Sequence, residues 1–372
     1  LAGGFAVDSL NWRYIFYVNL PLGILALLVT NRVLRLPVRK RQVQIDWWGA
    51  LLLVAGVACI LLATQSGGTQ YPWGSWQIIG LFALGVVILG GFVVREHLAA
   101  EPILPLELFR MQIFSVANII SFVSGIAMFG ALAFLPQYLQ LVHGVSATDS
   151  GLLLLPLLLG LLAMSIGSGR YISRTGNYRW FPLAGTILVT VGLAMLSRIG
   201  AHTSLTIVGL DILVFGAGLG LFTQVLTLVV QNAVPMRLMG VGTSSVAFFR
   251  SMGGAIGASA LGAVLTASIA KNFLHYLPRA DLANGKDKVS QLVASPAAVH
   301  ALKRTNPALH EGIIQAYAHA IDALFLVAVP ISVVSVIAAL FVRQVQLRSK
   351  AGGHKADGEP IDDAVPLGGG MH

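Results

Sequence analysis

The residues of this chain that could do chemistry are three ionisable groups set inside long apolar stretches. Asp211 lies about two turns inside such a stretch, Arg250 about two and a half turns inside another, and Asp322 about one turn inside a third, shortly after His319. A charge inside a membrane is costly, so it normally faces a partner or a water-filled cavity. The two aspartates therefore predict proton or cation coupling, with hydration near the membrane surface as the alternative. Arg250 lies deeper and predicts a structural or gating pair.

Uncharged polar and aromatic side chains in the same stretches could line a substrate cavity. Glutamine amides hydrogen-bond to a neighbouring helix as readily as to a bound solute, and both uses remain open. Phenylalanine rings suit a pocket for an apolar drug, although packing against lipid or other helices explains them too. The candidate cavity residues are Phe129, Phe134, Gln137, Gln140, Phe215, Gln224 and Phe248, with Phe222 as a further ring.

Patterns typical of enzymes and metal centres are missing from the sequence. No G-x-x-x-x-G-K-[ST] loop occurs, so ATP is not expected to drive the protein directly. The glycines at 216, 218 and 220 lie inside an apolar stretch, where helix packing explains them better than nucleotide binding. His310 and Glu311 are adjacent, but one pair does not make a metal site. We expect no enzyme activity, no catalytic residues, no metal and no cofactor.

Nine apolar stretches must position these residues. Each has at least about the 17–20 residues that a helix needs to cross a hydrocarbon core of ~30 Å. The chain is 56% hydrophobic and 10% charged, with a mean hydropathy of +0.80, whereas a soluble domain is roughly 25% charged. Its 41 glycines allow close helix packing. We expect an all-α polytopic membrane protein with helices over 13–34, 47–66, 76–95, 112–141, 150–168, 180–199, 204–229, 241–270 and 319–342.

Basic residues are distributed unevenly between the two sides of the predicted bundle, and this distribution sets its orientation. On one side the short loops hold only Arg13 and Arg198, beside a long connection over 271–318 that obeys the charge rule weakly. We therefore expect the C-terminus in the cytoplasm. The net charge of +9 is a topology signal, not a nucleic-acid site. The expected cytoplasmic side holds Arg32, Arg35, Arg39, Lys40, Arg41, Arg95, Arg110, Arg170, Arg174, Arg179, Arg237, Arg343, Arg348, Lys350 and Lys355.

Both ends of the sequence differ from the apolar stretches between them. The chain opens with Leu1, and residues 1–8 read as the last turns of an apolar helix whose beginning is missing. We expect an N-terminally truncated fragment, in which this stub is the remnant of a tenth helix. The residues over 344–372 lack apolar periodicity, and we expect a disordered cytoplasmic tail.

Five segments carry spaced motifs. Gly3 and Gly4 precede a W-R-x-x-F-x-x-N-x-P-x-G segment that contains Trp12, Arg13, Asn19, Pro21 and Gly23. The others are an E-P-x-x-x-L-x-L-F connector over 101–109, an L-P-x-Y-x-Q stretch over 135–156, a loop with Gly169, Arg170, Arg174 and Gly176, and an R-x-x-G-G-x-x-G helix beginning at Arg250.

In their order along the chain, these segments resemble the motifs of the fourteen-helix drug:proton antiporters of the major facilitator superfamily. The loop resembles the superfamily motif G-x-x-x-D-R-x-G-R-K in its second-half copy, where Ser173 stands at the Asp position and the basic pair is reduced to Arg179. The resemblance implies gating roles for Gly169, Arg170, Arg174, Gly176, Trp12, Arg13, Asn19, Pro21 and Gly23.

The resemblance also implies a division of the chain. It implies a major facilitator fold with nine complete transmembrane helices and the stub of a tenth, lacking most of the N-terminal half. The expected parts are the end of the N-terminal six-helix half (1–34), a basic cytoplasmic linker (35–46), an extra central helix pair (47–95), a cytoplasmic connector (96–111), the C-terminal six-helix half (112–343) with its outside loop (271–318), and the tail (344–372).

The function implied by the resemblance is proton-coupled efflux of hydrophobic or cationic drugs across the cytoplasmic membrane by alternating access. The expected partners are these small substrates, protons and the lipid bilayer, with no nucleic acid, in a monomer with or without an accessory export protein. The alternatives are an exporter of a lipid or natural product, and a non-transporting membrane scaffold or inactive truncated product. The residues alone indicate only a polytopic α-helical carrier or channel.

Overall fold

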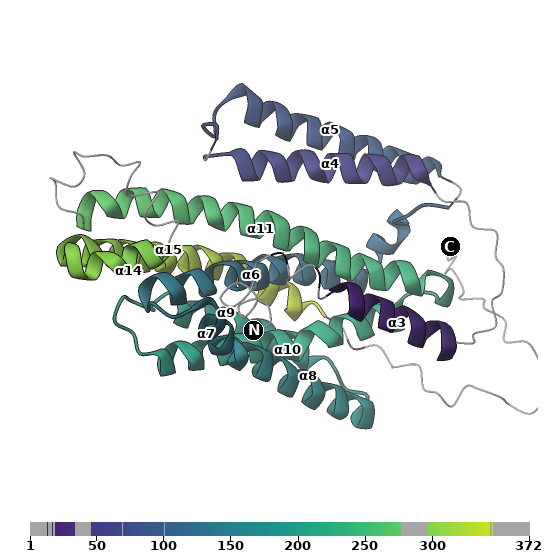
Figure 1. The fold of residues 1–372 in the computed structure, drawn as a ribbon. Coiled ribbons are helices and arrows are strands. Elements are labelled where there is room, and N and C mark those ends of the chain that lie inside the picture. Colours follow the sequence, from purple (N-terminus) through teal and green to yellow (C-terminus); the bar gives the residue numbers. More distant parts are fainter. Residues whose placement is uncertain are drawn as a thin grey trace, which may run out of the picture.

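The computed structural model describes residues 13, 17, 19–33, 46–68, 70–99, 101–276, 296–342 and 344. Within these residues the regular elements are helices, joined by short turns (Figure 1). They are α3 (Asn19–Val33), α4 (Trp47–Ser66), α5 (Trp76–Leu98), η1 (Leu106–Arg110), α6 (Gln112–Val142), α7 (Ala147–Leu153), α8 (Leu155–Thr175), α9 (Trp180–Leu196), α10 (Leu205–Ala233), η2 (Met236–Leu238), α11 (Met239–Tyr276), α14 (Pro296–Thr305) and α15 (Pro307–Leu340).

The nine expected transmembrane stretches are all present as helices among these elements. Seven helical segments are long and apolar enough to cross a membrane, with α7 and α8 counted as one, and α3 and α9 are shorter apolar helices. The prediction of an all-α polytopic membrane protein is therefore confirmed. The expected stub of a tenth helix, Trp12, most of the basic linker and most of the tail lie outside the described residues.

The expected outside loop over 271–318 differs from the structure, because part of it is helical. α11 continues to Tyr276, α14 forms within the loop, and α15 begins at Pro307 instead of 319. The side chain of Asn306 accepts a hydrogen bond from the backbone N–H of Leu309 at 3.1 Å and so caps α15. The first turns of α15 alternate polar and buried apolar residues, and a search for continuous apolar runs therefore misses them.

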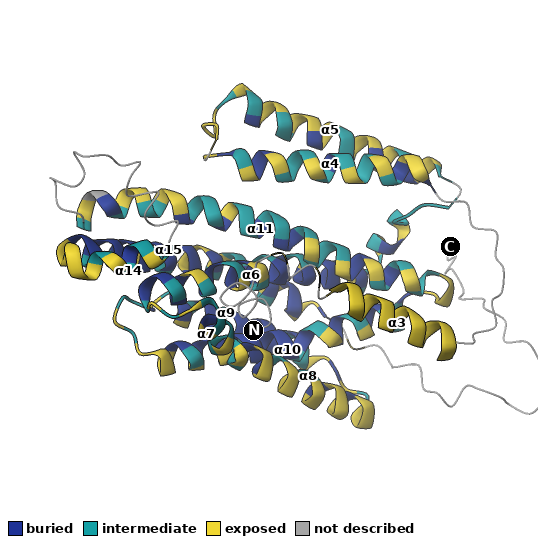
Figure 2. Ribbon diagram, viewed as in Figure 1, coloured by how far each residue is buried: buried dark blue, intermediate teal, exposed yellow. Residues whose placement is uncertain are grey.

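Six spans pack into one body, which we call the C-terminal body and define as α6 to α11 with α15. α6 lies against α11, α10 lies against α8 and α9, and α15 contacts α6, α9 and α11. The buried residues concentrate at the centre of this body (Figure 2). Tyr138, Phe215 and Phe325 are among its largest fully buried side chains. The body is therefore an arrangement of packed helices rather than a set of separate spans.

Glycines let α10 approach its neighbours closely. A Cβ at Gly216 or Gly220 would collide with the backbone carbonyl of Leu157 or Leu161 on α8. On another face of α10, a Cβ at Gly218 would lie 2.6 Å from the backbone nitrogen of Val189 on α9. The glycine stripe expected to serve helix packing thus has that role, since a larger residue at these positions would force the helices apart.

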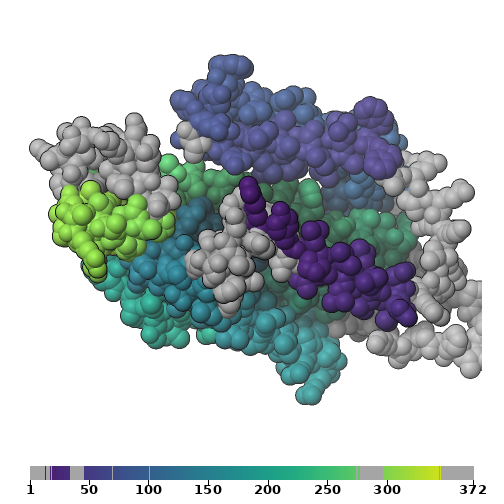
Figure 3. All heavy atoms as spheres, viewed as in Figure 1, coloured from purple at the N-terminus to yellow at the C-terminus, as the bar shows by residue number. Residues whose placement is uncertain are grey.

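α4 and α5 form a hairpin beside the C-terminal body, and α3 stands apart from both. The hairpin lies along α11, which α4 contacts (Figures 1 and 3). A Cβ at Gly85 of α5 would lie 3.2 Å from the Cβ of Cys59 on α4, so the two helices of the hairpin pack closely. Every residue of α3 is exposed, including Asn19, Pro21 and Gly23 (Figure 2).

Candidate functional site

The helix that carries Arg250 is held against α6 by a run of close backbone contacts, which we call the α6–α11 seam. A Cβ at Gly253 would collide with the carbonyl oxygen of Phe122, and a Cβ at Gly257 would lie 2.6 Å from the Cα of Ile126. On α6, a Cβ at Gly125 would collide with the carbonyl of Arg250 itself. The R-x-x-G-G-x-x-G motif is therefore a packing surface that fixes where Arg250 sits relative to α6.

The Arg250 side chain is partly buried, and no hydrogen bond or ion pair joins its guanidinium to any residue that the structure describes. The two residues before it, Phe248 and Phe249, are aromatic. The ring of Phe249 meets Phe248 edge to face at 5.5 Å and Phe109 of η1 at 6.1 Å. The pair that the sequence predicts for Arg250 thus has no member within the C-terminal body, and the gating role stays a prediction.

A polar cluster occupies the end of the C-terminal body that we expect to face outward. Tyr138 of α6 is fully buried, and its hydroxyl donates to the carbonyl of Gly200 at 2.8 Å. The Nε2 atom of His143, just beyond α6, lies 3.3 Å from the same hydroxyl. Burial lowers the pKa of His143, which favours a neutral imidazole there. Asp211 is on α10 and Asp322 is on α15, and both of these helices pack against α6, which carries Tyr138.

Asp322 of α15 is a carboxylate with an unmet hydrogen-bonding requirement. Its Oδ1 atom is buried and has no hydrogen-bond partner among the described residues. Its Oδ2 atom lies 3.8 Å from Nδ1 of His319, whose ring stacks on Tyr276 of α11 at 5.2 Å. A buried carboxylate oxygen without a donor disfavours the ionised form, because burying a charge costs far more than burying a neutral carboxylic acid. Asp322 is therefore placed where binding a proton relieves an energetic cost.

Asp211 lies inside α10 and is only 4% exposed, and no hydrogen bond to it is found among the described residues. The role of Asp211 in proton or cation coupling stays a prediction. Asp211 and Asp322 are carboxylates on two different helices that both pack against α6. The sequence identifies both residues, but this packing is visible only in the structure.

The candidate cavity residues differ in exposure and in the neighbours that they contact. Gln137 accepts a hydrogen bond from the Tyr317 hydroxyl at 3.1 Å, and Gln140 donates to Ser150 at 3.1 Å, so both amides serve helix contacts. Phe215 is fully buried against Gly192 of α9. The other members differ in exposure: Phe134 and Phe222 are buried, Phe248 is partly buried, and Phe129 and Gln224 are exposed.

Exposure divides the candidate cavity residues between two uses. Buried rings such as Phe134 and Phe215 serve packing, because their surfaces are already occupied by neighbouring helices. Phe129, on the α6–α11 seam, is 38% exposed and offers its remaining surface to a further helix, to lipid or to a substrate. Gln137, Gln224 and Phe248 likewise keep free surface. A substrate role for the candidate cavity residues stays a prediction.

The loop after α8 has the geometry that its glycine predicts, and its Arg179 lies over the ring of Trp180 at 5.6 Å. Gly176 adopts φ of 69°, a left-handed conformation that favours glycine, and so terminates α8. The side chain of Gln344 donates to the Gly176 carbonyl at 3.1 Å, which ties the C-terminal end of the chain to this loop. Arg170 and Arg174 are exposed, as is Gly169. Of the other gating candidates, Arg13 is exposed.

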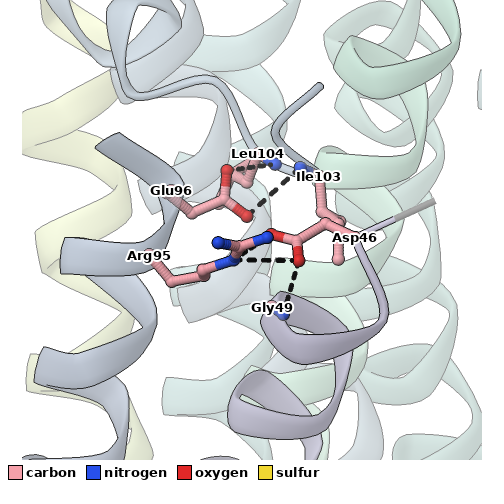
Figure 4. Close-up of polar contacts among 6 residues, drawn as sticks. All are labelled: Asp46, Gly49, Arg95, Glu96, Ile103 and Leu104. Atoms are coloured by element: carbon pink, nitrogen blue, oxygen red, sulfur yellow. Dashed lines mark hydrogen bonds and ion pairs between the residues drawn. The ribbon is translucent and has the colours of Figure 1, made fainter. Parts of the chain in front are cut away.

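At the other end of the molecule the structure contains an ion pair that the sequence does not predict. Asp46 caps α4 by accepting from the N–H of Gly49 at 3.1 Å, and it also accepts from Nε of Arg95 at 3.0 and 3.2 Å (Figure 4). The hydrogen bond from Gly49, helped by Arg95 and opposed by burial, holds the pKa of Asp46 below its usual value. The aspartate directly before an apolar helix is a capping signal from which the cap could have been predicted.

A pocket of about 650 Å³ lies at the same end as this ion pair, beside the connector between α5 and α6. It is lined by both acidic and basic residues, among them Glu107, Arg110 and Arg237, and none of the candidate cavity residues lines it. No group of three or more His, Cys, Asp or Glu side chains with a geometry suited to a metal ion occurs in the described residues. The pocket thus gives no support to the predicted drug cavity.

Comparison with known proteins was made on the whole chain. A family profile described as Major Facilitator Superfamily matches residues 1–258. An uncharacterized MFS-type transporter of Mycobacterium tuberculosis is 40% identical over 371 residues, which cover 100% of this chain and 51% of that protein. The multidrug transporter protein MdtP of Bacillus subtilis is 38% identical over 71% of this chain and 49% of its own length. Multidrug resistance protein 3 of the same organism is 28% identical over 94% of this chain and 69% of its own.

Proposed function

Because the chain belongs to the Major Facilitator Superfamily, we propose that it carries the C-terminal body and central hairpin of a drug exporter. Members of this family are transporters and not enzymes. The proposal draws its substrate class from the printed names of two relatives, a multidrug transporter and a multidrug resistance protein. The chain spans about half the length of the first of these two relatives. Drug export by this chain is therefore proposed and does not follow from the similarity alone.

The proposed mechanism is alternating access, in which two helical bodies rock around a central cavity. The α6–α11 seam supports it, because closely packed backbones move as one piece and carry Arg250 and Phe129 with them. These residues keep free surface on the body, where an apolar drug can contact the ring of Phe129. A cationic drug is attracted to the face of an aromatic ring, whereas the charge of Arg250 opposes its approach.

Proton coupling is proposed to act through Asp322, with Asp211 as the second acid. The single observation that carries this step is the buried Oδ1 atom of Asp322, which has no donor within the described chain. Protonation removes the cost of that buried charge, and deprotonation restores it. A conformational change that opens the cluster to water favours the ionised form, so proton binding and body movement are coupled. No cofactor is required in this scheme, since the proton gradient supplies the energy.

The proposed location is the cytoplasmic membrane, with the C-terminus in the cytoplasm. The basic residues of the short loops support this orientation. In the proposed division of the chain, the end of the N-terminal half precedes the linker, the hairpin and connector follow, and the C-terminal body completes the fold. The working unit is proposed to be a monomer, with an accessory export protein as an optional partner.

The experiment that tests this function is dye efflux from cells that express the natural full-length protein. We expect an ethidium-like dye to leave loaded cells, and a protonophore to stop this efflux. Asp322→Asn should abolish the dependence on the proton gradient without removing the protein from the membrane. Efflux that continues after the gradient is collapsed would contradict proton coupling. Competition by lipids or natural products, but not by drugs, would instead favour the other class of exporter. A membrane-inserted protein that moves none of these compounds would favour the scaffold.

A further inference from the structure

The ends of the α4–α5 hairpin are fastened to each other and to the chain that follows. Arg95, near the end of α5, donates from Nε to both oxygens of Asp46, the residue before α4. The next residue, Glu96, accepts from the backbone N–H groups of Ile103 and Leu104 at 3.2 and 3.1 Å (Figure 4). We call Asp46, Arg95 and Glu96 the hairpin clamp. Two adjacent side chains thus tie α5 to α4 on one side and to the connector on the other.

The two acidic side chains of the clamp are buried, and its arginine is partly exposed. The side chain of Asp46 is 4% exposed, and Glu96 is likewise 4% exposed, whereas Arg95 keeps 40% of its side-chain surface. Both oxygens of Glu96 are used by backbone donors, and both oxygens of Asp46 are used by Arg95. Loss of either contact would leave a buried carboxylate short of donors, which is costlier than loss of an exposed ion pair.

The connector is in turn anchored on the C-terminal body. Leu108 of η1 is buried, and the neighbouring Phe109 ring meets Phe114 of α6 edge to face at 5.0 Å. Phe109 also meets Phe249 of α11, and its carbonyl accepts from the hydroxyl of Ser115 at 2.6 Å. An unbroken series of contacts therefore runs from the start of α4, through the clamp and the connector, to α6 and α11.

We infer that the hairpin clamp makes the α4–α5 hairpin a mechanical part of the C-terminal body, so that hairpin and body move together as the transporter changes state. The contact of α4 with α11 adds a second attachment along the length of the helix. All residues of α3 are exposed, in contrast to the buried acidic side chains of the clamp. The inference rests on the family fold and the clamp, and not on the identity of the substrate.

The test measures how firmly the far end of the hairpin is held. α4 has 20 residues, so the α4–α5 turn lies about 30 Å from the clamp. A small movement of the helix ends at the clamp therefore produces a large displacement of the turn. Spin labels are placed at Gly74, in that turn with open space around it, and at Ser204, an exposed residue before α10. The background is the natural full-length protein with Cys59→Ser. The readout is the distribution of distances between the two labels.

We expect one narrow distribution in the parent and a distinctly broadened one in the double variant Arg95→Gln with Glu96→Ala. The matched control is Glu107→Ala with Arg110→Gln, which removes the same charges from exposed positions on the connector. This control should remain as narrow as the parent. Arg95→Lys, which keeps the charge but loses the planar donor, should broaden the distribution less and serves if the double variant does not fold.

Two results would overturn the inference. One is a double variant, or Arg95→Lys where the double variant fails to fold, whose distribution is as narrow as that of the control, since the clamp would then hold nothing. The other is a Gly74 to Ser204 distance in the parent that is broad, or that shifts when substrate is added or the pH is lowered. The distance measurements remain possible if the protein fails the drug-efflux assay. The clamp variants are compared with their control in the absence of any substrate.

Discussion

Replacing Gly257 by alanine tests the α6–α11 seam at a position where the neighbour has no freedom to move aside. The added Cβ would lie 2.6 Å from Cα, 2.8 Å from Cγ2 and 2.9 Å from Cβ of Ile126. Ordinary contact for such an atom begins at 3.4 Å, so the shortfall against the backbone atom is about 0.8 Å. A side chain could rotate away, but the Cα of Ile126 moves only with α6. The two helices must therefore separate locally.

The expected cost follows from two opposing terms. Forcing an extra methyl group into a packed interior costs roughly 1–3 kcal/mol. Replacing a glycine inside a helix by alanine returns about 0.5–1 kcal/mol through chain entropy. The net expectation is a loss of about 1–2 kcal/mol for Gly257→Ala. Gly262→Ala, five residues further along α11, is the matched control, because its Cβ would lie 3.4 Å from a terminal ring atom of Phe134. This control should be neutral or slightly stabilised.

The assay is unfolding of the purified protein in detergent, followed by loss of helix signal with heat or denaturant. Gly257→Ala should unfold at a clearly lower midpoint than Gly262→Ala, with similar helix content before unfolding. Transport by the natural full-length protein should fall for Gly257→Ala and persist for the control. Equal midpoints for the two variants would refute the reasoning, because a seam that accepts a methyl group at Gly257 is not closely packed there.

Three further predictions concern the candidate site and the orientation of the chain. Arg250→Ala should strongly reduce transport at normal expression, and Arg250→Lys should rescue poorly if the contact is planar and well if only charge matters; normal transport by the alanine variant would return Arg250 to a surface role. Asp322→Asn should flatten the pH dependence of dye efflux, since the neutral amide imitates the protonated acid, and an unchanged pH profile would exclude Asp322 as the coupling acid. With Cys59→Ser as background, a cysteine at Arg174 should label only from the cytoplasm and one at Gly74 only from outside; labelling of both from one side would disprove the predicted orientation.

The sequence predicts the transmembrane helices well, because long apolar runs are a direct consequence of the solvent around them. The sequence-based prediction fails for helical segments that lie outside the continuous apolar runs. The first turns of α15 carry His310, Glu311 and Gln315 among buried apolar residues, so no continuous apolar run marks them. α14 is short and strongly amphipathic, with basic residues in its last turn, and is missed for the same reason. Periodicity, rather than hydropathy, would have found both.

The sequence predicts which residues belong to the candidate site but not how these residues are arranged in space. Asp211, Arg250 and Asp322 stand out because charges are rare in apolar runs, and that rarity is visible in the sequence. The placement of the two aspartates on helices that both pack against α6 depends on the fold, which spacing along the chain does not encode. The exposure of each phenylalanine depends on packing in the same way, so the sequence could not separate Phe129 from Phe215.

Proton flux in sealed vesicles tests whether proton binding at Asp322 drives export. The natural full-length protein is reconstituted with a pH-sensitive dye inside the vesicles, and an ethidium-like substrate is added. We expect substrate movement to be accompanied by proton movement in the opposite direction, and Asp322→Asn to remove the proton signal. Substrate movement without any proton signal in the parent protein, or a full proton signal in Asp322→Asn, would contradict this expectation.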